Sequence, residues 1–125
     1  MTDQTSAPWP TELKLAKDKT WLTVNYDDGR SFDFPAEFLR VMSPSAEVKG
    51  HGADTRVTVP GKKNVRIARL DPVGNYAVRL TFSDGHNTGL YSWTYLRKLG
   101  DEHATLWGEY LAELKAKGLS REAKH

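Results

Sequence analysis

The chain has no cysteine among its 125 residues. Disulfide bonds, thiolate metal sites and thiol nucleophiles are therefore excluded, and so is a zinc finger. It also lacks any run of 18 apolar residues, and residues 1–6 show neither the basic start nor the apolar centre of a secretory signal. These absences predict a protein that does not enter membranes and that resides in the cytoplasm.

An excess of charge of one sign is missing as well. The chain carries 18 basic and 16 acidic residues, for a formal net charge of +2, which is too balanced to predict nucleic-acid binding. Neighbouring cations could still form a stripe, which we interpret as a solvated sheet face, with contact to RNA or to an acidic protein as the alternative. No aromatic residue alternates with these cations on their face, so nucleic-acid binding is not expected. We expect a protein partner instead, and we favour a monomer although the sequence does not determine the oligomeric state. The cations are Lys62, Lys63, Arg66, Arg69 and Arg79.

The first half of the chain has the pattern of an antiparallel meander. Residues 12–15 and 21–26 alternate with period two, and Asp27-Asp28-Gly29 supplies turn residues before a third strand at 30–34. Pro35 then fits the first turn of a short helix over residues 36–41, because its ring presets φ and its missing N–H costs little there.

The second half begins with an irregular segment, residues 43–64, in which only 56–59 resemble a strand. A hairpin of residues 65–70 and 76–82 follows. In its second strand the period predicts that Tyr76 and the residues at every second position after it face the core. These residues are Val78, Leu80 and Phe82.

Two helices are expected near the C-terminus. Ser92 can cap a helix that runs through Leu99 and that Gly100 would stop. The second helix has apolar residues at helical spacing between Leu106 and Leu114, which we interpret as core packing, with a partner-docking face as the alternative. Glu113 and Lys117 are placed to pair within it, and Gly118 is placed to end it.

These patterns predict an α+β fold, with a mainly antiparallel sheet and helices packed on one face. We expect a flexible arm at residues 1–10 and a domain at 11–100. A C-terminal helix at 101–118 packs on that domain, and residues 119–125 fray.

No catalytic pattern is found in the sequence. It has no Gly-x-Ser-x-Gly elbow and no phosphate-binding Gly-x-x-x-x-Gly-Lys-Ser/Thr loop. The spacing of His51 and Asp54 is one residue too long for the facial triad of an iron oxygenase. We interpret the acidic pairs Asp27-Asp28 and Asp101-Glu102 as a turn and a helix start, so an enzyme is not expected.

The segment of residues 73–93 joins a strand, a Ser-Asp-Gly turn, His86 and the helix entry Leu90-Tyr91-Ser92-Trp93. Together with Phe38-Leu39-Arg40, residues 43–48 and Gly50-His51-Gly52, it resembles the gamma-butyrobetaine hydroxylase-like N-terminal domain family. In the hydroxylases this domain precedes an iron- and 2-oxoglutarate-dependent oxygenase domain. Similar domains are fused to nucleotide-binding iron–sulfur scaffold proteins, so the resemblance implies an accessory role in handling iron or iron–sulfur clusters.

The resemblance also implies a zinc position, held in the hydroxylases by three cysteines and one histidine. Here Ser43, Ser45 and Val48 stand at the cysteine positions and His86 at the histidine position. A serine hydroxyl is a poor zinc ligand and valine is none, so we expect the zinc site to be lost and no cofactor to be bound.

His86 is then expected to cap or crosslink its loop. In the alternative, His86 and His51 converge in a polar pocket beside Tyr91 and Trp93, where they bind a metal such as iron or a small anion. Two imidazoles alone bind a metal weakly, so a carboxylate would have to join them. The candidates for that carboxylate are Glu47, Asp54 and Asp84.

The function predicted from these features is a non-catalytic binding or adaptor module. Its binding surface would be formed by the loops at residues 45–52 and 85–93, and Arg40 is either a surface ion pair or part of the site. The alternative is a small metal- or ligand-binding protein that uses His51 and His86.

Overall fold

A computed structural model describes residues 9–44, 58–87 and 89–122. Its first antiparallel sheet has the order β1-β2-β3 and leads into a short helix, and its second has the order β4-β5-β6 and leads into two helices. The first set is β1 (Pro10–Leu15), β2 (Trp21–Tyr26), β3 (Ser31–Pro35) and α1 (Ala36–Val41). The second set is β4 (Ile67–Val73), β5 (Ala77–Phe82), β6 (Leu90–Ser92), α2 (Trp93–Asp101) and α3 (His103–Ala116).

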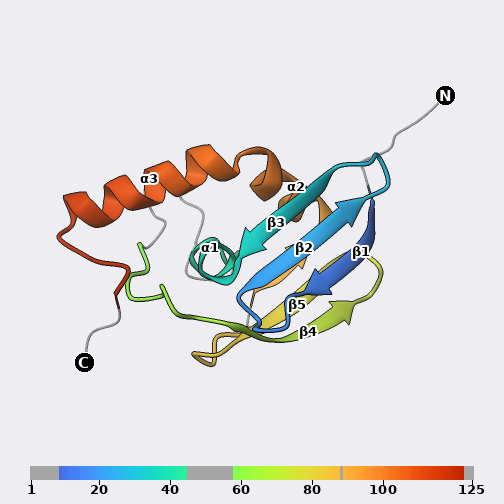
Figure 1. Ribbon diagram of the computed structural model, residues 1–125, viewed down its shortest axis with the longest axis horizontal. Helices are drawn as coiled ribbons and strands as arrows, with labels where there is room; N and C mark the ends of the chain where they lie inside the picture. Colours follow the sequence, from blue (N-terminus) through green and yellow to red (C-terminus); the bar gives the residue numbers. More distant parts are fainter. Residues whose placement is uncertain (1–8, 45–57, 88, 123–125) are drawn as a thin grey trace.

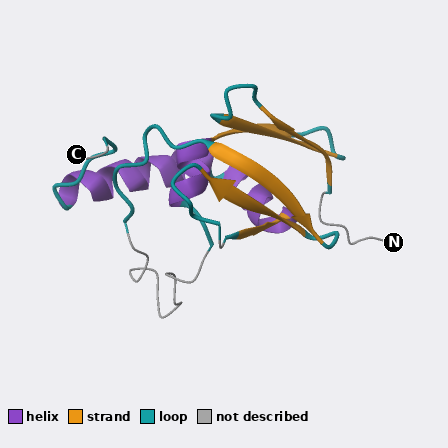
Figure 2. Cartoon of the chain, turned by 90° about the horizontal axis from the view of Figure 1, so that it is seen from below, coloured by secondary structure: helices purple, strands orange, loops and turns teal. Residues whose placement is uncertain are grey.

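The expected α+β class is confirmed, although the strands form two small sheets instead of one. One hydrophobic core joins both sheets and all three helices, and α2 contacts β3 of the first sheet and β6 of the second. The long helix α3 extends beyond the strands (Figures 1 and 2). None of the described helices is long and apolar enough to cross a membrane.

The period-two patterns place most strand side chains correctly. In β2 the side chains of Leu22, Val24 and Tyr26 are buried, as the alternation requires. In β5 the buried residues include Val78, Leu80 and Phe82, as predicted. The prediction for Tyr76 is wrong, because this residue lies before β5 and is 53% exposed. Its ring lies against Gly74, which has a positive φ of 55° in the turn between β4 and β5.

The helix ends follow their predicted caps at Ser92 and Gly118 but not at Gly100, nor at Asp101, which ends α2 and does not begin the next helix. The Ser92 side chain accepts a hydrogen bond from the Tyr95 N–H, which confirms it as the N-cap of α2. Gly100 does not stop that helix, which continues to Asp101. A Cβ at position 100 would lie 2.6 Å from the ring of Phe32, so glycine is needed there for close packing. Gly118 has a positive φ of 67° after α3, as expected for a C-terminal cap.

The described residues nearest the two ends of the chain are hydrogen-bonded to the body of the domain. The Trp9 N–H donates to Asp27 Oδ1, and the Asp27 N–H donates back to the Trp9 carbonyl. At the other end, the expected fraying does not begin at Leu119. The Ser120 and Arg121 carbonyls accept hydrogen bonds from the N–H groups of Gly61 and Lys63. Residues 119–122 therefore form part of the folded domain.

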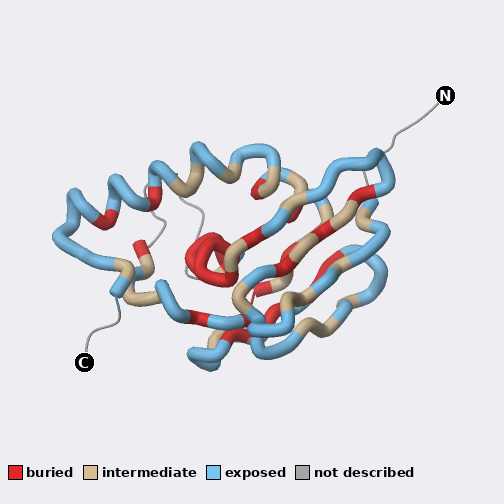
Figure 3. The backbone as a smooth tube through the Cα atoms, in the orientation of Figure 1, coloured by how far each residue is buried: buried red, intermediate tan, exposed pale blue. Residues whose placement is uncertain are grey.

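Burial differs strongly between the helices. Helix α1 is buried along most of its length, whereas α3 buries only one side (Figure 3). Tyr110 and Leu114 provide the buried side of α3. The expected pairing of Glu113 with Lys117 is indirect, because the Thr58 hydroxyl donates to Glu113 and accepts from Lys117.

Candidate functional site

The predicted site around His86 lies where the turn between β5 and β6 meets the residues that follow α1. Ser43 Oγ and His86 Nε2 are hydrogen-bonded at 2.9 Å. The first and last of the four positions that the resemblance assigned to zinc are thus in direct contact. The backbone of Gly89 lies close to the Ser43 side chain, because a Cβ added to Gly89 would overlap Ser43 Oγ.

Asp84 joins three segments beside this contact. Its Oδ2 accepts hydrogen bonds from Arg40 Nε at 2.9 Å and from Lys62 Nζ at 2.6 Å. Its Oδ1 accepts from the His86 N–H at 3.0 Å. Partial burial by itself would raise the pKa of Asp84, but the hydrogen bonds from Lys62, His86 and Arg40 outweigh it and lower the pKa to about 2. We call Arg40, Lys62 and Asp84 the Asp84 clasp, since it joins α1, the segment before β4 and the turn after β5.

Among the described residues, the contacts of this cluster are those of a crosslink between segments. The donor set does not fit zinc, because Ser43 offers a neutral hydroxyl that is already bonded to the His86 nitrogen. Within residues 9–44, 58–87 and 89–122, no three His, Asp or Glu side chains are placed to hold a metal ion. A carboxylate held by two cations is also a weak base, so Asp84 is poorly suited to proton abstraction.

The other predicted site residues that the structure describes take up different positions relative to His86, and the Tyr91 ring and Ser43 Oγ both lie beside Gly89. Tyr91 is fully buried and donates its hydroxyl hydrogen bond to the Leu39 carbonyl, so it belongs to the core. Trp93 donates through Nε1 to the Asn75 carbonyl at 2.8 Å, in the turn between β4 and β5. Arg40 is linked to His86 through Asp84, which accepts hydrogen bonds from both the Arg40 side chain and the His86 N–H.

Several predicted residues lie outside the described part of the chain. They include His51, the partner proposed for His86, and Glu47, the proposed carboxylate. Ser45, Val48 and Asp54 lie there too.

A second candidate site lies where β2 begins and β3 ends. The segment leading into β4 passes this end of the first sheet (Figure 1). Together they line a hollow of about 300 Å³, which we call the Trp21 hollow. Trp21 is 46% exposed there and pairs with Pro35 across the two strands. Its lining also includes Ala36, Asn64, Arg66 and Arg121.

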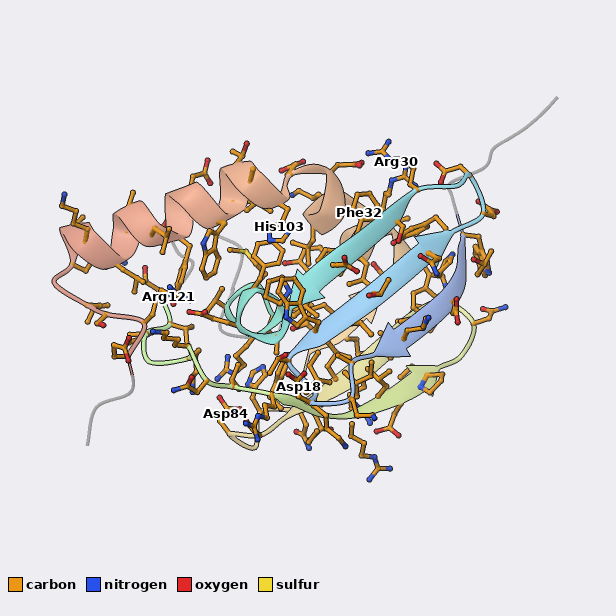
Figure 4. All side chains as sticks on the ribbon, in the orientation of Figure 1. Asp18, Arg30, Phe32, Asp84, His103 and Arg121 are labelled. Atoms are coloured by element: carbon orange, nitrogen blue, oxygen red, sulfur yellow. The ribbon has the colours of Figure 1, made fainter. Side chains whose placement is uncertain are left out.

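Charged side chains border the Trp21 hollow. Arg121 forms a two-pronged ion pair with Glu37 of α1, with distances of 2.7 and 2.8 Å, and its guanidinium lies over the ring of Trp107. Figure 4 shows Arg121 between the C-terminal segment and α1. Lys63 pairs with Glu122 at 3.0 Å. The Arg66 side chain has no ion pair or hydrogen bond to any described residue.

The sequence contained a signal for this hollow. Because Leu22, Val24 and Tyr26 face the core, the same alternation places Trp21 on the opposite side of β2. The approach of Arg66 and Arg121 has no such signal, because it depends on how segments distant in sequence pack.

Comparison with known families identifies the domain. The family model described as gamma-butyrobetaine hydroxylase-like, N-terminal, matches residues 13–97, which is more than half of the chain. The chain belongs to this family. The resemblance first noted in residues 73–93 and in the pieces between Phe38 and Gly52 is thereby confirmed.

Solved structures with sequences similar to this chain show the same fold. An NMR solution structure with 50% sequence identity covers 100% of this chain and 93% of its own, with a TM-score of 0.82. Another NMR solution structure, at 45% identity, covers 96% and 94% of the two chains with a TM-score of 0.82. A crystal structure from Acidithiobacillus ferrooxidans, of a protein of unknown function in the DUF971 family, has 38% identity and a TM-score of 0.61. It covers 73% of this chain and 91% of that one. No curated protein matches significantly.

Proposed function

We propose that this member of the family is a non-catalytic module that binds a protein partner through the Trp21 hollow. The observation that carries the proposal is a tryptophan left 46% exposed beside a hollow of about 300 Å³. Tryptophan is enriched among the residues that dominate binding energy at protein interfaces, since it offers a large rigid surface.

The Asp84 clasp supports this module in a structural role. It ties the segment before β4 to α1 and to the turn after β5, and that segment continues into the wall of the Trp21 hollow. The cluster that the sequence suggested as a binding site thus helps to hold a different surface in place. Of the loops expected to form the binding surface, residues 45–52 lie outside the described residues.

The alternative of a small metal- or ligand-binding protein has less support. His86 Nε2, one of the two nitrogens of the proposed ligand, is bonded to the Ser43 hydroxyl. The fusion of similar domains to iron–sulfur scaffold proteins suggests, by resemblance alone, that the partner handles iron or its clusters.

Photocrosslinking from two matched positions tests the proposal. A photoreactive phenylalanine analogue replaces Trp21 in one variant and Trp9 in the other, since Trp9 is similarly exposed at 49% but does not line the Trp21 hollow. In cells, we expect discrete adducts with a protein from position 21 and none from position 9. Equal adducts from both positions, or none from position 21, would contradict the proposal.

A further inference from the structure

The apolar part of the lining of the Trp21 hollow comes from four residues, Trp21, Pro35, Ala36 and Val65. The Trp21 ring and Pro35 come from paired positions on β2 and β3. Ala36 and Val65 also line the hollow and are buried, at 1% and 8% exposure. An aliphatic or aromatic side chain placed here would remove apolar surface of both partners from water.

The charged part of the hollow has one cation, Arg66, whose side chain makes no ion pair or hydrogen bond to a described residue. Lys63 and Arg121 each have a carboxylate partner, whereas the Arg66 side chain has none within the described residues. The Arg66 backbone is fixed, because its N–H donates to Ser83 Oγ at 2.9 Å and its carbonyl accepts from the Ser83 N–H at 2.8 Å. A guanidinium on a fixed backbone is well suited to donate two parallel hydrogen bonds to a carboxylate.

An exposed amide completes the set of recognition groups. Asn64 lines the hollow two residues before Arg66, and its side chain makes no hydrogen bond to a described residue. A primary amide offers both donors and an acceptor, as does the backbone of an extended peptide. Asn64 can therefore pair with a main chain that lies across the hollow.

We infer that the Trp21 hollow takes an extended acidic segment of the protein partner. A carboxylate of that segment pairs with Arg66, an apolar side chain next to it packs on Trp21 and Pro35, and the main chain pairs with Asn64. This inference rests on the proposed function and adds the chemistry of the segment that is recognised.

The distribution of charge favours a peptide over a nucleic acid. Glu37 lines the hollow, Asp18 lies close enough to be influenced by Arg66, and Glu122 is bonded to Lys63 at its border. Regularly spaced phosphates would meet these carboxylates as well as the cations, and would be repelled by them. A peptide can place a single carboxylate at Arg66 and present an apolar side chain beside it.

Titration with short synthetic peptides tests the inference. The probe is acetyl-Ala-Asp-Leu-Ala-amide, which carries one carboxylate beside one apolar side chain, and its control replaces Asp with Asn. In proton–nitrogen NMR spectra we expect the acidic peptide to shift the Trp21 indole and the Asn64 side-chain amide saturably, while the Trp9 indole stays in place. The amide peptide should bind roughly tenfold more weakly, as expected when a charge-assisted pair is replaced by neutral groups.

Charge variants locate the contact. Arg66→Gln should weaken acidic-peptide binding roughly fivefold or more, because it removes the paired cation. Arg79→Gln is the matched control: it removes an exposed arginine that also has no ion pair to a described residue, but from β5. The Arg79→Gln variant should change the dissociation constant of the peptide by no more than about twofold, which is the change expected from net charge alone. Asp18→Asn should strengthen binding about twofold, because a competing carboxylate near Arg66 is removed.

Several outcomes would overturn the inference. They are equal binding of both peptides, equal loss from Arg66→Gln and Arg79→Gln, or the absence of a shift at the Trp21 indole. Shifts of the same signals by oligouridylate, with none by the acidic peptide, would assign the hollow to nucleic acid. If position 21 still crosslinks to a protein while the acidic peptide fails to bind, the inference fails and the proposed function stands. If position 21 does not crosslink, the proposed function itself fails.

Discussion

Asp84 is a single residue on which three hydrogen-bond donors converge, and its effect on stability should depend on pH. Its pKa is about 2 in the folded protein against 3.8 for the unpaired side chain. A carboxyl group with a lowered folded pKa binds a proton more readily after unfolding. Its contribution is therefore complete above pH 4 and disappears as the pH falls from about 4 to about 2.

We expect Asp84→Asn to lower the free energy of unfolding at pH 7 by roughly 1 kcal/mol, because solvent screens part of the two ion pairs. The difference from the original protein should vanish near pH 2. Urea unfolding at several pH values measures it, and an NMR titration measures the pKa of Asp84 directly. A pKa near 4, or a difference that persists unchanged to pH 2, would contradict the role of the Asp84 clasp.

Arg121 and Glu37 form the second ion pair that matters at the residue scale. The Glu37 side chain is only 7% exposed and lies in α1, so removing its partner would leave a buried carboxylate uncompensated. We expect Arg121→Met to lower the free energy of unfolding by about 2 kcal/mol, less than for a fully buried pair because Arg121 is 39% exposed. Urea unfolding gives the value.

Glu37→Gln combined with Arg121→Met is the control for this pair. Without the carboxylate no charge remains buried, so the double variant should recover part of the lost stability. If it is no more stable than Arg121→Met alone, the loss comes from the contact of Arg121 with Trp107 and not from the unpaired charge.

At the scale of elements, two helix glycines should respond in opposite directions to the same substitution. A Cβ at Gly100 in α2 would lie 2.6 Å from the Phe32 ring, whereas a Cβ at Gly108 in α3 would meet no atom within 4 Å. We expect Gly100→Ala to cost about 1–3 kcal/mol, because α2 must move away from β3. Gly108→Ala should stabilise by about 0.5–1 kcal/mol, since alanine loses less backbone entropy in a helix.

Thermal unfolding followed by circular dichroism compares the two variants. A melting temperature for Gly100→Ala at or above that of the original protein would show that α2 and β3 are not closely packed. The Gly108→Ala result then tests whether α3 is a regular helix at that position.

At the scale of the whole molecule, the two sheets should unfold together. Each has only three strands, and one core joins Leu22 and Phe34 of the first sheet to Leu80 and Phe82 of the second. If one sheet unfolded alone, the remaining three-stranded sheet would expose most of its buried face. We therefore expect both sheets to unfold in a single two-state transition. Hydrogen exchange should give the same opening free energy for the central amides of β2 and β5. A clearly lower value for one sheet would show that it opens alone.

Local patterns were sufficient to identify most elements of this protein. The period of two placed β2, β3 and β5, the Asp-Asp-Gly turn joined β2 to β3, and Ser92 and Gly118 marked helix ends. These features depend on neighbours in the chain, so the sequence alone predicts them. The family was also recognisable from short local motifs. The fit of Gly100 against Phe32 was missed, because a glycine required by a distant ring resembles a glycine that ends a helix.

The candidate site shows the same division between local and distant contacts. From the sequence we named His86 and Arg40 and expected His86 to crosslink its loop. We did not foresee that Asp84 joins Arg40 to Lys62. Trp21 was predictable as an outward-facing residue from the alternation of β2. Its place beside Arg66 and Arg121 follows only from tertiary structure. The sequence by itself determined the α+β class and the family. Packing between distant segments decided which charges are paired and which remain available, because an ion pair depends on distance in space and not on separation along the chain.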